Sequence, residues 1–62
     1  MNIGQTFKSY DKYIGFNGVC VVSTVRPDEI IVTYLETKNQ KVIPKSKIKG
    51  LLESGAFIEV TQ

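Results

Sequence analysis

Hydrophobic and other residues alternate through several short segments of the chain, and this period of two is typical of β-strands. The clearest segment is "GVCVVSTV", residues 18 to 25. Val19, Val21, Ser23 and Val25 share one face of it, and Cys20, Val22 and Thr24 share the other. Because both faces are fairly apolar, the pattern predicts a central strand, or a strand that bends across two layers of a sheet.

A second strand is predicted for "IIVTYLE", residues 30 to 36, because β-branched and aromatic residues dominate it. Ile30, Val32 and Tyr34 share one face of this strand, and the residues between them share the other. The preceding "RPDE", residues 26 to 29, is typical of a type I turn, since proline pre-sets φ at the second position. The two strands are therefore expected to pair as antiparallel neighbours.

Two interpretations stay open for the residues before Gly18. The dipeptide Asn17-Gly18 tolerates positive φ at two successive positions, as a type I′ hairpin turn demands. In that case residues 12 to 16 form a strand that pairs with Val19 and the residues after it. In the other interpretation the segment is a looser loop in which Gly15 and Gly18 both act as hinges.

Two further strands are predicted in the second half of the chain. After the polar turn "TKNQ", the short segment "KVI", residues 41 to 43, is ended by Pro44. The segment "AFIEV", residues 56 to 60, returns to a period of two, with Phe57 and Glu59 on one face.

The residues between these two strands follow a helical period instead. Their apolar positions stand at i, i+3 and i+4, and they are Ile48, Leu51 and Leu52. We predict a helix over residues 45 to 54, with Ser46 as its N-cap and Gly55 just beyond its end. Gly50 lies inside it and costs about 1 kcal/mol relative to alanine, so the helix is expected to be short.

The order of these elements predicts an all-β class: a small antiparallel barrel or bent five-stranded sheet with one short helix before the last strand. Three segments carry a resemblance to a known architecture, and they are "GFNGVCVVSTV", "DEIIVTYLE" and "VIPKSKIKGLLESGAFIEV". They resemble SH3-like small barrels of the KOW, Tudor and chromo type. The resemblance implies a five-stranded sheet that bends and partly closes on itself, with a helical turn before the final strand.

The length and composition limit the number of domains and the class of protein. With 62 residues and 42% hydrophobic content, residues 1 to 62 are expected to form a single small domain. Residues 1 to 10 are predicted either to pair as an edge strand or to remain a flexible arm. No apolar run is long enough to suggest a membrane span or a signal peptide, and a lone thiol fits a reducing compartment. We therefore expect a cytoplasmic protein without a membrane partner.

Catalysis is not expected, because the residues that most often perform it are missing. The chain has no histidine, so it lacks the most common general base near neutral pH and the common Cys/His zinc sites. Cys20 stands between two valines and is expected to be a buried structural residue rather than a nucleophile. The glycines show no phosphate-binding fingerprint, and no cofactor or metal is predicted.

Positive charge provides the one candidate for a functional surface. The formal net charge is only +2, but the window from Thr37 to Leu52 contains lysines and no acid: Lys38, Lys41, Lys45, Lys47 and Lys49. In the predicted helix Lys45 and Lys49 fall on one flank of the apolar stripe and Lys47 on the other. If these lysines gather on one surface, they neutralise phosphates of DNA or RNA with weak sequence specificity. The alternative is that they form the solvated rim of a short helix.

Aromatic residues add a lesser candidate to this surface. Tyr10, Tyr13 and Phe16 are interleaved with Lys8 and Lys12, and an exposed ring can stack on a base. Tyr13 is therefore included as a nucleic-acid-binding candidate, beside the alternative that these rings cover the core.

The sequence thus supports two functions. The first is a small non-enzymatic nucleic-acid-binding accessory or regulatory module. The second is a protein–protein interaction module, such as a regulator, inhibitor or assembly subunit, that presents a sheet edge or an apolar patch including Tyr13, Phe16 and Phe57. A homo-oligomer is compatible with either, and the Ile-, Lys- and Asn-rich composition suits a small phage-encoded product.

Overall fold

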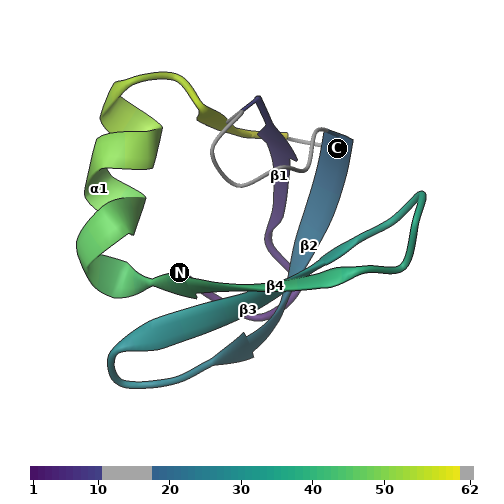
Figure 1. Ribbon diagram of the computed structural model, residues 1–62, viewed down its shortest axis with the longest axis horizontal. Helices are drawn as coiled ribbons and strands as arrows, with labels where there is room; N and C mark the ends of the chain where they lie inside the picture. Colours follow the sequence, from purple (N-terminus) through teal and green to yellow (C-terminus); the bar gives the residue numbers. More distant parts are fainter. Residues whose placement is uncertain (11–17, 61–62) are drawn as a thin grey trace.

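The fold was established from a computed structural model, which describes residues 1–10 and 18–60. Its elements are β1 (Thr6–Ser9), β2 (Gly18–Val25), β3 (Glu29–Tyr34), β4 (Gln40–Pro44), α1 (Lys45–Glu53) and β5 (Phe57–Glu59). The strands form one five-stranded antiparallel sheet in the order β4-β3-β2-β1-β5, and α1 precedes the last strand (Figure 1). The predicted fold class is therefore confirmed.

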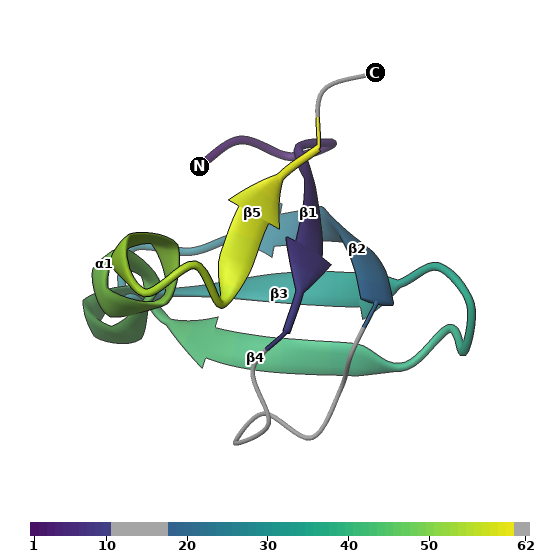
Figure 2. The same ribbon diagram turned by 90° about the horizontal axis from the view of Figure 1, so that it is seen from above.

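The central strand β2 bends, as its two apolar faces predicted. Gly18 to Val21 pair with β1, and Cys20 to Val25 pair with β3. Between Val22 and Thr24 the register with β3 shifts, because Ser23 is an extra residue opposite the partner strand. One strand therefore belongs to both parts of the sheet, and β1 and β5 cross over β3 and β4 (Figure 2).

The shifted register corrects one predicted strand face. Alternation placed Val25 with Val19 and Val21, opposite the buried Cys20 and Val22. An extra residue inverts the alternation beyond it. Val25 accordingly pairs with Ile30 and packs against the core.

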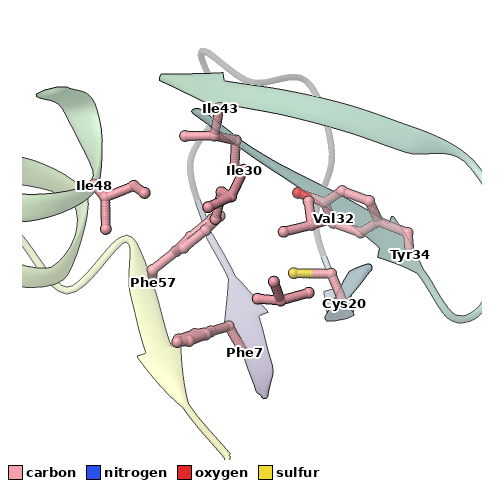
Figure 3. Close-up of a cluster of buried hydrophobic side chains, with 9 residues drawn as sticks. Phe7, Cys20, Ile30, Val32, Tyr34, Ile43, Ile48 and Phe57 are labelled. Atoms are coloured by element: carbon pink, nitrogen blue, oxygen red, sulfur yellow. The ribbon is translucent and has the colours of Figure 1, made fainter. Parts of the chain in front are cut away.

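The core lies between the crossing parts of the sheet. Its buried apolar residues are Phe7, Cys20, Val22, Ile30, Val32, Tyr34, Ile43, Ile48 and Phe57. The rings of Phe7 and Phe57 lie 5.9 Å apart, which joins β1 to β5 (Figure 3). The predicted inner face of β3, with Ile30, Val32 and Tyr34, is confirmed, since all three are buried.

Part of the N-terminal segment is an interior strand of the sheet. Thr6–Ser9 forms β1, which lies between β2 and β5 and contributes Phe7 to the core. It is therefore neither an edge strand nor a free arm. The strand expected at residues 12 to 16 lies outside the described residues, as does Asn17 of the expected turn. The strand partner of Val19 is Lys8.

The helix begins directly after β4, which corrects its predicted N-cap. Pro44 occupies that position with extended backbone angles, no side chain caps the helix, and Ser46 lies within the first turn. The N–H of Lys45 still donates to the carbonyl of Asp28 at 2.9 Å, so the β3–β4 ladder continues into the first helical residue. Because hydrogen-bonded pairs alternate along such a ladder, the N–H that Pro44 lacks would face away from β3.

The end of the helix is as predicted. Gly55 follows the C-cap Ser54 with φ of +80°, a left-handed conformation that favours glycine. The N–H of Ser54 donates to the carbonyl of Gly50, and the N–H of Gly55 donates to that of Leu52. These bonds satisfy the last helical carbonyls and turn the chain toward β5.

Alanine at the two helix-associated glycines is predicted to change stability in opposite directions. A Cβ at either Gly50 or Gly55 would meet no other atom within 4 Å, so backbone preference alone decides the outcome. Gly50→Ala should raise the free energy of unfolding by about 0.5–1 kcal/mol, and Gly55→Ala should lower it by about 1–2 kcal/mol. Urea denaturation measures both, and two changes of the same sign would contradict this account of the helix.

Candidate binding surface beside the helix

A groove of about 390 Å³ lies along one side of α1 and is called the α1 groove below. It is lined by Met1, Lys45, Ile48, Lys49 and Leu52. Three of these side chains are apolar, and the other two carry positive charge on long aliphatic stems. The groove thus combines an apolar floor with a basic rim.

The position of the groove follows from how α1 is anchored. The helix contacts β3, β4 and β5, and Ile48 reaches from it toward Ile30 and Phe57 (Figure 3). Burying this side chain contributes about 1.5–3 kcal/mol of transfer free energy. Leu52 lies one turn further along the same side and remains 44% exposed. The apolar stripe therefore continues from the core into the groove.

Two of the candidate lysines meet at this groove. Lys45 and Lys49 are one helical turn apart and both line it, as their predicted position on one flank of the apolar stripe requires. Lys47 is exposed on the same helix but does not line the groove. The helix therefore separates its lysines into a pair and a single residue.

The other candidates lie elsewhere. Lys41 is half-buried in β4, where it pairs with Val32. Lys38 is exposed in the β3–β4 turn, which lies at the opposite end of β4 from α1 (Figures 1 and 2). Its φ of 64° is a left-handed backbone conformation that is unusual for residues other than glycine or asparagine. Tyr13 lies outside the described residues.

The lysines around the groove are not paired with any carboxylate that the structure describes. Within residues 1–10 and 18–60, Lys45, Lys47 and Lys49 form no ion pair. Two carboxylates elsewhere in the fold do have partners. Arg26 pairs with Glu29 at 2.9 Å, and Gln5 donates a hydrogen bond to Glu59 at 2.7 Å. Among the residues that the structure describes, no acidic side chain lines the groove, so the charges on its described rim are positive.

The expected aromatic surface is only partly present in the described residues. Tyr10 is 49% exposed, and the ammonium group of Lys8 lies 5.5 Å from the centre of its ring. Phe57 is buried in the core at 2% exposure, which corrects its place in an exposed apolar patch. Its position in β5, paired with Ser9 of β1, directs the ring inward. Phe16 lies outside the described residues.

Cys20 is a buried structural residue, as predicted, with 1% of its surface exposed. Desolvation by this burial raises the pKa of the thiol from an ordinary 9.0 to about 11, and a backbone hydrogen bond with Phe7 offsets part of the rise. A thiol that stays protonated near neutral pH is a poor nucleophile.

Other classes of site find no support in the part of the chain that the structure describes. It contains no group of three or more histidine, cysteine, aspartate or glutamate side chains that could hold a metal ion. Nor does it contain a helix with the length and apolar character needed to cross a bilayer.

Comparisons with protein-family models, with curated proteins and with solved structures find no match to this chain. Its candidate function therefore rests on its own residues and their geometry.

Sequence reasoning found the lysines but missed the groove that two of them border. Ile48 and Leu52 were visible as part of a helical stripe, but the pattern did not show which of them the core covers. Met1 gave no local signal, because its approach to α1 depends on the path of β1 through the sheet.

The thiol of Cys20 is predicted to react slowly in the folded protein. At pH 8, a pKa of about 11 rather than 9.0 leaves about a hundredfold less thiolate, and burial further restricts access. Reaction with an aromatic disulfide reagent should be at least a hundredfold slower than after unfolding in urea. Equal rates in the two states would contradict the buried position of this residue.

The same residue is predicted to make stability fall at alkaline pH. The folded thiol keeps its proton up to about pH 11, whereas the unfolded thiol loses it near 9.0, so the folded state binds more protons between these values. Stability should therefore decline between about pH 9 and 11. Cys20→Ala should show a shallower decline over this window, measured by urea denaturation at each pH, and parallel curves would contradict this contribution.

Proposed function

We propose that this chain is a non-enzymatic binding module that takes a protein partner at the α1 groove. The observation that carries the proposal is the composition of that groove. Leu52 is 44% exposed and continues the apolar stripe of Ile48, and Lys45 and Lys49 border it without ion pairs among the described residues. An apolar centre with a polar rim is the usual anatomy of a protein-binding surface.

The distribution of the lysines favours a protein over a polyanion at this groove. Affinity for nucleic acid depends on several phosphates being neutralised together. Of the lysines in the described part of the chain, Lys45 and Lys49 border the groove, while Lys38 lies at the other end of β4. An apolar floor forms no favourable contact with a phosphate backbone, but an apolar side chain of a protein partner can be buried against it.

Nucleic-acid binding remains a second candidate because of one observation. Lys45, Lys47 and Lys49 lie on the same nine-residue helix, and none of them is paired with a carboxylate within the described ranges. Lysines position a phosphate backbone but do not read bases. Binding of this kind would have weak sequence specificity.

The proposal of a binding module rather than an enzyme is supported by the available side chains. The chain has no histidine, and the pKa of its one thiol is raised to about 11. Histidine is the most common general base near neutral pH, and a thiol acts as a nucleophile through its thiolate.

Substitution of Leu52 is predicted to abolish partner capture. Leu52→Asp places a charge on the groove floor, whereas Leu35→Asp places it on the β3–β4 turn at a leucine of nearly equal exposure, 44% against 45%. In affinity capture from the source cells, proteins retained by the unsubstituted chain and by Leu35→Asp should be lost with Leu52→Asp. Equal loss with both variants, or with neither, would contradict the proposed site.

Salt dependence separates the two candidate functions. If nucleic acid is the partner, three neutralised phosphates of a single strand give a slope of about −2.1 in log affinity against log salt, which weakens binding more than tenfold between about 50 and 200 mM. Lys47→Ala should then weaken binding of a labelled single-stranded oligonucleotide as much as Lys45→Ala does. The proposed protein-binding function predicts no such binding at either salt concentration.

A further inference from the structure

We propose that the partner segment held in the α1 groove is an acidic amphipathic helix, whose leucines seat against Ile48 and Leu52 while its glutamates pair with Lys45 and Lys49. This inference rests on the proposed function and adds the chemistry of the partner. It follows from the pattern along α1, where the groove residues read Lys-x-x-Ile-Lys-x-x-Leu from Lys45 to Leu52. The complementary pattern is Glu-x-x-Leu-Glu-x-x-Leu.

The spacing of the two lysines along the rim determines the spacing of the acidic residues that the partner segment needs. Lys45 and Lys49 are four residues apart on α1, which corresponds to a rise of about 6 Å along the helix axis. Carboxylates four residues apart on a partner helix have the same rise. A helix laid alongside α1 can therefore place one glutamate near each lysine at once.

The positive charge of the groove determines the charge of the partner segment, which should be acidic. Among residues 1–10 and 18–60, two lysines and no acid line the groove, and neither lysine has an ion-pair partner. A basic partner would meet only repulsion there, and a neutral apolar partner would restrict two ammonium groups without compensation. An acidic segment forms two ion pairs beside an apolar floor, where they are less exposed to water than isolated surface pairs.

The apolar floor of the groove requires apolar side chains on the face of the partner that meets it. Ile48 is fixed by the core, Leu52 is nearly half exposed, and Met1 lines the groove and packs against the core. Methionine is unbranched and adapts to the shape of the side chain that meets it. Leucines at i+3 and i+7 of a partner helix project to one side, as this floor demands.

The experiment is a titration of the isotope-labelled protein with a capped, alanine-rich peptide of about fifteen residues that contains Glu-x-x-Leu-Glu-x-x-Leu. Amide shifts should change at Lys45, Ile48, Lys49 and Leu52 rather than at the β3–β4 turn. Replacing both glutamates by glutamine should weaken binding about five- to tenfold, because two surface ion pairs are lost. The double substitution Lys45→Glu/Lys49→Glu should weaken binding of the glutamate peptide at least tenfold.

A charge exchange makes the result specific. The double variant should bind a peptide with lysine in place of both glutamates more tightly than the unsubstituted protein does. The variant Lys38→Glu/Lys47→Glu carries the same net charge change outside the groove and should bind the glutamate peptide within about twofold of the unsubstituted protein. Well-dispersed amide spectra of both double variants confirm that they are folded.

Several outcomes would overturn the inference. These are equal affinity for the glutamate and glutamine peptides, no binding of any peptide, or shifts that lie away from the groove. Stronger binding of a single-stranded oligonucleotide at the same amides would also overturn it, in favour of nucleic acid. A concentration-dependent dimer in sedimentation, abolished by Leu52→Asp, would do so in favour of a second copy of this chain.

Failure of this inference is distinguishable from failure of the proposed function. If the peptides fail but partner capture is still lost with Leu52→Asp and kept with Leu35→Asp, the groove is a protein site for a segment of other chemistry. If capture does not depend on Leu52, the groove is not the binding site, and the acidic partner is rejected with it.

Discussion

The bend of β2 is the constraint on which the rest of the molecule depends. Ser23 is an extra residue in the β2–β3 ladder, and it lies just beyond the part of β2 that pairs with β1, while pairing with β3 continues past it to Val25. Cys20 and Val22 fill the space between the crossing parts of the sheet. A single continuous strand therefore serves both parts, and a small chain obtains a two-sided core without a second sheet.

The helix follows from the same geometry. Strands β4 and β5 lie at opposite edges of the sheet, so the chain must travel from one edge to the other after Pro44. α1 makes this connection and inserts Ile48 into the core, and Gly55 turns the chain into β5. Because the helix is short and held by few buried residues, Leu52 and the aliphatic stems of Lys45 and Lys49 remain outside. The groove is the part of the apolar stripe that the core does not cover.

Much of this fold could be predicted from local pattern, and the exceptions have physical causes. Alternation identified β2, β3 and β4 and the inner face of β3, because side chains there follow a strict period of two. It failed beyond Ser23, since an extra residue leaves no mark in the composition of a strand. It also left undecided whether β1 forms, because this four-residue strand is stabilised by pairing on both sides rather than by its own pattern.

The candidate site was less predictable, because neighbours in sequence do not remain neighbours in space. Lys38 and Lys45 are seven residues apart, but the five residues of β4 between them span about 17 Å. The continuous lysine window is thus divided among a turn, a strand and a helix. The groove itself needs Met1, which reaches α1 only through the long-range fold.

The most direct test of the central claim, that the α1 groove is the binding site, is photo-crosslinking in the source cells. A benzophenone side chain replaces Glu53, which is exposed at the end of α1, or Glu36, which is exposed in the β3–β4 turn. The account predicts a covalent adduct from position 53 that a protease destroys and a nuclease leaves intact, with none from position 36. Equal adducts from both positions, or an adduct that a nuclease removes, would contradict it.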